Sequence, residues 1–100
     1  MEKPKVICLC GSTRFKKEFE RVNYDETLKG NIILTVGCFG HADGVEFTED
    51  QKTALDELHK RKIDIADEIL VINVDGYIGS STKSEIEYAK KENKGIRYYE

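Results

Sequence analysis

The sequence contains no long apolar run, and this absence excludes one class of protein. No window of the chain approaches the roughly 18 consecutive apolar residues that a membrane-spanning helix requires. The apolar segment that follows residues 1–5 is five or six residues long, which is too short for the core of a signal peptide. We therefore expect a protein without a membrane partner.

Cysteine is scarce and odd in number, with three residues in the chain. We expect reduced thiols and a cytoplasmic protein, with Cys8 and Cys10 serving as core side chains of a buried strand. Cys38-x-x-His41 lacks the second pair of ligands of a zinc site, and Cys8-x-Cys10 does not have the spacing of zinc ligands. We predict no metal and no organic cofactor. The other histidine, His59, is expected on the exposed face of a helix.

An excess of basic residues is missing as well, since the formal net charge is −3. Binding to a nucleic-acid polymer normally needs a basic face, so we expect no such partner. A small anionic ligand held by a few backbone amides remains compatible with this charge. The chain also lacks linkers, low-complexity tracts and solenoid repeats, and we expect residues 1–100 to form a single domain.

What the sequence does contain is a regular alternation of strand and helix patterns. Apolar runs predict strands at residues 6–10, 32–36, 69–74 and 96–99. Helical spacing predicts helices over about 14–29, 49–66 and 82–92, the second with a Thr48-x-x-Gln51 capping box and with Ala54, Leu55 and Leu58 on one side. Residues 37–47 hold three glycines and predict a mobile loop.

This alternation is typical of an α/β fold with a parallel sheet of four to five strands, in a flavodoxin-like or Rossmann-like three-layer sandwich. Ligands of such sheets bind outside the carboxyl ends of the strands, where the strand order reverses. Gly11 and Asp75 each follow a predicted strand directly. If these strands are neighbours, both segments face one crevice.

The first junction is Gly11-Ser12-Thr13-Arg14. Glycine lets a backbone approach a ligand closely, the hydroxyls and first helical amides donate to an anion, and Arg14 adds a bidentate cation. The segment therefore predicts a site for a phosphate or carboxylate. The alternative is that Ser12 or Thr13 only caps the helix. A P-loop is excluded, because its Gly-Lys-Ser/Thr ending is absent.

The second junction runs from Asp75 to Glu85. Its glycines, its aromatic residue Tyr77 and its hydroxyl residues precede a predicted helix with Glu85 in the first turn. Thr82-x-x-Glu85 fits a capping box, in which Glu85 only bonds a backbone amide. The other interpretation makes Glu85 a nucleophile that the helix dipole keeps ionised, as retaining glycosyl transfer requires. Asp64, near a helix C-terminus where the dipole disfavours a carboxylate, is a second candidate.

At these residues the sequence resembles a known family. Residues 9–15 (Leu-Cys-Gly-Ser-Thr-Arg-Phe), Asp64 and residues 84–89 (Ser-Glu-Ile-Glu-Tyr-Ala) are similar to the nucleoside 2-deoxyribosyltransferase superfamily, which includes 2′-deoxynucleoside 5′-monophosphate N-glycosidases. The resemblance implies that Glu85 attacks C1′ of the deoxyribose and displaces the base, which Asp64 helps to protonate. It also implies a flavodoxin-like fold and a homo-oligomer in which a neighbouring subunit completes the site.

The resemblance further implies that Ser12 and Arg14 contact a 5′-phosphate, with Ser80 or Ser81 near a second such position. We expect the remaining ligand contacts from the two junctions and the glycine-rich loop. These residues are Gly11, Thr13, His41, Asp75, Tyr77 and Gly79.

Three functions stay open at this point. The first is an enzyme that cleaves or exchanges the N-glycosidic bond of a 2′-deoxynucleoside or its 5′-monophosphate through a glycosyl–Glu85 intermediate. The second is a nucleotide-binding module without activity, since a fold alone does not establish chemistry. The third is a subunit that only oligomerises. A glycohydrolase of NAD similar to TIR domains is a further enzyme hypothesis, for which the sequence holds no separate motif.

Overall fold

The protein is described by a computed structural model that covers residues 3–100. Its elements follow in the order β1 (Val6–Gly11), α1 (Lys16–Leu28), β2 (Ile32–Leu34), α2 (Gly40–Asp43), α3 (Glu49–Ile65), β3 (Glu68–Ile72), a 3-10 turn η1 (Val74–Gly76), α4 (Ser80–Lys91) and β4 (Gly95–Tyr98). Among the described residues, no helix is both long and apolar enough to cross a membrane.

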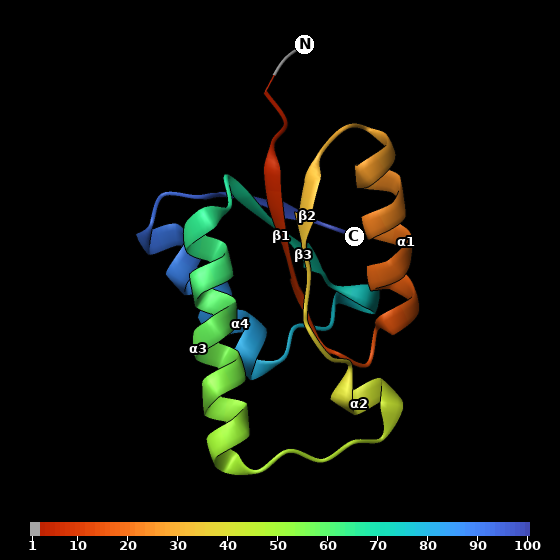
Figure 1. Ribbon diagram of the computed structural model, residues 1–100, viewed down its shortest axis with the longest axis vertical. Helices are drawn as coiled ribbons and strands as arrows, with labels where there is room; N and C mark the ends of the chain where they lie inside the picture. The colour runs from red at the N-terminus through yellow and green to blue at the C-terminus, as the bar shows by residue number, and fades with distance from the viewer. Residues whose placement is uncertain (1–2) are drawn as a thin grey trace.

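The four strands form one parallel sheet in the order β2-β1-β3-β4. This confirms the predicted α/β class, and the arrangement is compatible with a flavodoxin-like three-layer sandwich. The sheet is the middle layer (Figure 1): α1 covers one face, and α3 and α4 cover the other. Helices on both faces bury the central strands, which explains why these read as continuous apolar runs.

Alternation along the strands divides the core into two halves. Ile7 and Leu9 of β1 pack with Phe19 of α1, on one face of the sheet. Cys8 and Cys10 point to the opposite face, where they join Ile63 of α3 and other side chains of α3, β3 and α4. Successive strand residues face opposite sides, so a strand covered on both faces needs apolar side chains at every position. The prediction that Cys8 and Cys10 are core side chains of a buried strand is therefore confirmed.

The strand order reverses between β1 and β3, because β1 continues to β2 on one side while the later strands lie on the other. These two strands are direct neighbours, and Gly11 pairs with Ile72 at their carboxyl ends. A Cβ at Gly11 would stand 2.9 Å from the carbonyl oxygen of Ile72. Glycine therefore permits the close approach of the strands at the point where parallel sheets bind ligands.

Several element boundaries differ from the sequence-based expectation. The second strand ends at Leu34, and the third ends at Ile72 before a 3-10 turn. The glycine-rich segment 37–47 contains one turn of helix, α2, so it is not loop throughout. Helix α1 begins at Lys16, two residues later than expected, and α4 begins at Ser80, two residues earlier.

The face of α3 that packs on the sheet is also different from the expected one. Its capping box at Thr48 and Gln51 is present, as predicted. However, Leu58 is 53% exposed, whereas His59 and Ile63 are the buried residues of the helix. The amino-terminal part of α3 extends beyond the end of the sheet (Figure 1), where no strand lies beneath it to bury an apolar face.

Candidate functional site

A pocket of about 750 Å³ lies at the carboxyl ends of β1 and β3. Four segments form its walls: the first junction, the loop that contains α2, one face of α3 and the second junction with the start of α4. Of the residues predicted to bind or react, the pocket is lined by Gly11, Ser12, Thr13, Arg14, His41, Tyr77, Gly79, Ser80, Ser81 and Glu85. The expectation that the two junctions face one crevice is therefore confirmed.

At the first junction the chain forms a turn rather than a helix start. The backbone N–H of Phe15 donates to the Ser12 carbonyl, and no side chain in residues 3–100 caps α1. The capping interpretation of Ser12 and Thr13 is thus wrong. Instead the Ser12 Oγ accepts a hydrogen bond of 3.2 Å from Nε of Arg14, and the Thr13 Oγ1 accepts one of 3.3 Å from the backbone N–H of His41.

Arg14 also reaches across the pocket to the second junction. Its guanidinium lies over the Tyr77 ring, 4.5 Å from the centroid, and its Nη2 donates to the Tyr77 hydroxyl at 3.5 Å. A cation over the face of an aromatic ring is attracted by the ring quadrupole. These contacts hold an exposed cation at the pocket, next to the Ser12 hydroxyl.

The second junction leads into α4, whose N-cap is Gly79. The first intrahelical bond that closes there runs from the Lys83 N–H to the Gly79 carbonyl, at 3.0 Å. The amides that come before it, at Ser80–Thr82, belong to the first turn and have no carbonyl of their own helix to donate to. Both serines line the pocket, so these amides supply donors of the kind that anions bind at helix N-termini.

Glu85 lies in the second turn of α4, not in the first. The predicted Thr82–Glu85 capping box is absent from the described residues, because the helix begins at Ser80. Glu85 is only 8% exposed, and this burial raises the pKa of its carboxyl to about 7. Desolvation is the largest influence on this carboxyl and outweighs the favourable charges, so its pKa shifts upward despite its place near the start of a helix.

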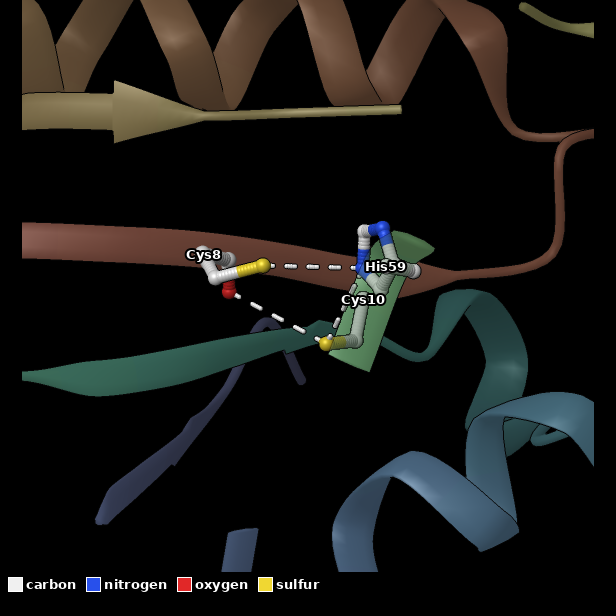
Figure 2. Close-up of side chains that lie close together, drawn as sticks. All are labelled: Cys8, Cys10 and His59. Atoms are coloured by element: carbon white, nitrogen blue, oxygen red, sulfur yellow. Dashed lines mark hydrogen bonds between the residues drawn. The ribbon is translucent and has the colours of Figure 1, made fainter. Parts of the chain in front are cut away.

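Cys8, Cys10 and His59 lie together beside Glu85 (Figure 2), and of these three only His59 lines the pocket. His59 is 7% exposed, so its expected exposure is wrong. Its Nε2 lies 3.0 Å from the Leu9 carbonyl oxygen and 3.5 and 3.6 Å from the two sulfur atoms.

The ionisable groups of this cluster and Glu85 shift the pKa values of one another. The hydrogen bond from Cys10 lowers the pKa of the Cys8 thiol to about 5, and the same contact raises that of Cys10. The neighbouring Glu85 raises the pKa of Cys10 further, by charge repulsion. Burial lowers the pKa of His59, but the contact with Cys8 more than offsets this, and the net shift is upward.

Two predicted site residues lie outside the pocket. Asp64 accepts a hydrogen bond from the Tyr88 hydroxyl of α4, and it forms an ion pair of 2.9 Å with Arg61 of its own helix. Asp75 occupies the 3-10 turn with a φ of 54°, and its backbone N–H donates to the Glu100 carboxylate. The role of Asp64 as an acid therefore lacks support from its position.

Sequence reasoning missed the polar face that α3 turns toward the pocket. This face carries Lys52, Asp56, His59 and Lys62. Their spacing of three or four residues is that of one helix face, and it is the signal in the sequence that was available. Asp56 makes a small contribution to the raised pKa of Glu85, after burial, and the two carboxyl groups line the pocket together with Glu46.

Comparison with models of known protein families finds no match to this chain, and comparison with curated protein sequences finds none either. The geometry and chemistry of the pocket are therefore the basis on which a function can be proposed.

Proposed function

We propose that the pocket binds a 2′-deoxynucleoside or its 5′-monophosphate and cleaves or exchanges the N-glycosidic bond through a covalent bond between the sugar and Glu85. One observation carries the proposal: a buried carboxyl and an anion-binding junction line the same pocket. A ligand with a reactive anomeric carbon and an anionic end fits such a pair. Retaining glycosyl transfer needs a carboxylate on one face of the sugar.

The covalent step balances with the groups of the pocket. One oxygen of the Glu85 carboxylate forms a bond to C1′ while the bond from C1′ to the base nitrogen breaks. The electron pair of the broken bond leaves with the base, which takes up a proton. Water or a second base then attacks C1′ and releases Glu85, giving hydrolysis or transfer. A pKa of about 7 leaves a substantial fraction of Glu85 ionised at neutral pH.

The proton for the departing base comes from Asp56 in this proposal. The resemblance assigned that role to Asp64, which lies outside the pocket and is engaged with Arg61 and Tyr88. Asp56 lines the pocket on α3, within electrostatic reach of Glu85. Enzymes that cleave glycosidic bonds with retention usually use two carboxyl groups. One is the nucleophile, and the other acts first as a general acid and then as a general base.

The 5′-phosphate binds at the first junction and at the start of α4. The guanidinium of Arg14 and the Ser12 hydroxyl supply a charge-assisted contact, and the amides of Ser80 and Ser81 add donors at a helix N-terminus. Tyr77 holds the guanidinium in place from the other wall.

A nucleotide-binding module without catalysis is the second candidate, and one observation favours it. The predicted acid Asp64 takes part in an ion pair outside the pocket. Such a module would bind the same ligands without release of the base, because binding uses the phosphate contacts alone.

The test is Glu85→Gln, with free base released from a panel of deoxynucleosides and deoxynucleotides measured by chromatography. We expect the wild type to release base and the variant to lose almost all turnover, because an amide is a poor nucleophile. Glu87→Gln is the matched control, since Glu87 lies on the same helix with its side chain 77% exposed. This control is expected to retain the wild-type rate.

Wild-type rates in Glu85→Gln would exclude the nucleophile. Binding of the panel by the wild type without any release of base would favour the module instead. During turnover, mass spectrometry of the wild type should detect the added mass of one deoxyribosyl group on the peptide that contains Glu85.

A further inference from the structure

We infer that Cys8, Cys10 and His59 form a binding site for a thiophilic divalent cation, with zinc as its occupant. The three side chains come from two elements, β1 and α3, and lie close together (Figure 2). The inference does not depend on the proposed function, because it concerns metal binding in the absence of substrate.

Sheet geometry brings the two thiols together. Residues two apart on a strand point to the same face, and both sulfur atoms lie on the side that α3 covers. Cys8 and Cys10 are 0% exposed, which shields their sulfur atoms from solvent. His59 completes the set from α3, and its ligand atom and the two sulfur atoms all lie within 4.8 Å of one another.

The distances agree with those of a tetrahedral centre. Nε2 of His59 lies 3.5 Å from the Cys8 sulfur and 3.6 Å from the Cys10 sulfur. With zinc–sulfur bonds of about 2.3 Å and zinc–nitrogen bonds of about 2.0 Å, a tetrahedral angle separates sulfur from nitrogen by about 3.5 Å. The two sulfur–nitrogen distances thus match those of a zinc site, and the two sulfur atoms lie within 4.8 Å of each other.

The donor set selects the metal. Two thiolates and an imidazole suit zinc, whereas magnesium and calcium require oxygen ligands. Three protein ligands leave one coordination position open, as in sites where a water molecule or another group completes the sphere. Of the three ligands His59 lines the pocket, whereas the two cysteines are fully buried.

Metal binding replaces one hydrogen bond of the free protein. The Leu9 carbonyl oxygen lies 3.0 Å from Nε2 of His59, and pairing of β1 with β2 ends one residue earlier, at Cys8. An N–H of His59 therefore donates to a carbonyl that β2 does not reach. When zinc binds, the proton on Nε2 of His59 leaves to water, and the neutral ring keeps or takes up its proton on Nδ1. Nε2 then supplies its lone pair to the metal, and the thiol protons that remain on Cys8 and Cys10 pass to water. A hydrogen bond to the Leu9 carbonyl would explain why His59 is buried at this place, but it would not explain why two sulfur atoms lie beside its Nε2.

The experiment is a titration of the metal-free, reduced full chain with Co²⁺, followed by absorbance. We expect a sulfur-to-cobalt charge-transfer band and the visible bands of tetrahedral cobalt, both saturating at one equivalent and abolished by Zn²⁺. Zn²⁺ should also raise the melting temperature of the wild type, because a ligand that binds only the folded state stabilises it.

Three variants locate the site. Cys10→Ser and His59→Gln should weaken cobalt binding by more than the roughly 10- to 100-fold that loss of an outer-shell partner costs. Cys38→Ser is the matched control, because Cys38 is exposed, and its band should be unchanged. Circular dichroism checks that each variant is folded. If a variant does not fold, the cobalt absorbance spectrum of the wild type still tests whether the site exists. Absence of the charge-transfer band in the wild type, or its loss in Cys38→Ser alone, would overturn the inference.

Discussion

At the scale of single residues, Arg14 connects the two junctions of the pocket. It bonds to Ser12 on its own side and stacks on Tyr77 from the other. An arginine with its guanidinium already oriented loses less freedom when it binds an anion, because its donor geometry is set in advance. Its role in the proposed function is therefore specific to the phosphate of the ligand.

Arg14→Ala should weaken binding of a deoxynucleoside 5′-monophosphate by roughly tenfold or more, since hydrogen bonds to charged groups contribute about 1.5–3 kcal/mol. Binding of the matching nucleoside should change little, because it lacks the phosphate. Titration calorimetry on both ligands measures the two affinities. Arg21→Ala serves as control, since Arg21 is an exposed α1 residue paired with Asp25. Equal losses for nucleotide and nucleoside would remove the phosphate role.

The sequence allowed the residues of both junctions to be predicted, because glycine and hydroxyl residues directly after apolar runs mark strand ends. It did not predict that His59 is buried or that Asp64 lies outside the pocket. One turn and a half of helix separates these two residues, and only the packing of α3 decides which one faces the pocket. A histidine is neither strongly apolar nor strongly charged, so its pattern does not predict burial.

At the scale of elements, the close pairing of β1 with β3 determines where the pocket lies. The approach at Gly11 leaves no room for a side chain, because a Cβ atom added there would stand 2.9 Å from the carbonyl oxygen of Ile72 and 3.0 Å from its Cβ. The backbone of a central strand has little freedom to move away.

Gly11→Ala should therefore lower the free energy of unfolding by about 1–3 kcal/mol, as overpacking in a core does. Urea denaturation followed by circular dichroism measures this change. Gly37→Ala is the control on the opposite pocket wall, because no atom lies within 4 Å of an added Cβ there. If both variants were as stable as the wild type, the strands would have more room than the structure indicates.

The face of α3 shows why element existence was predictable and element orientation was not. Its capping box and helical spacing are local signals, so the helix and its start were correctly predicted. Burial of a helix face depends on what lies beneath it. Leu58 and His59 are consecutive residues of α3, yet Leu58 is 53% exposed and His59 is buried against β1, and nothing in the local sequence predicts this difference.

At the scale of the whole molecule, a single chain assembles the pocket from segments far apart in sequence (Figure 1). The expected homo-oligomer, in which a neighbour completes the site, stays a prediction. The alternation of elements was sufficient to predict the parallel sheet and its layers. The prediction that both junctions face one crevice assumed that β1 and β3 are neighbours and did not derive it. The pairing of strands that are distant in sequence has no local sequence signal.

A partly buried ion pair connects helix α1 with strand β4, between residues that lie 71 positions apart in the sequence. Glu26 of α1 is 5% exposed and accepts hydrogen bonds of 2.8 Å from Arg97 of β4 and 2.9 Å from Lys29. Burial alone would raise the pKa of Glu26, but the two cations outweigh it and lower the pKa below the ordinary value. A carboxyl whose pKa is lower in the folded state than in the unfolded state stabilises the folded protein at pH values above the unfolded-state pKa. This stabilisation is lost as the pH falls through the folded-state pKa.

Glu26→Gln should therefore lower the free energy of unfolding by about 1–3 kcal/mol at neutral pH, because it removes a charged partner of Arg97. The difference from the wild type should shrink as pH falls below the ordinary range of a glutamate carboxyl and through the lowered pKa of Glu26, where Glu26 of the wild type becomes protonated. Urea denaturation across this pH range measures both effects. Glu20→Gln, at an exposed position of the same helix, should follow the wild type at every pH. A constant difference between Glu26→Gln and the wild type over the whole range would mean that packing of the side chain, rather than its charge, stabilises α1 against β4.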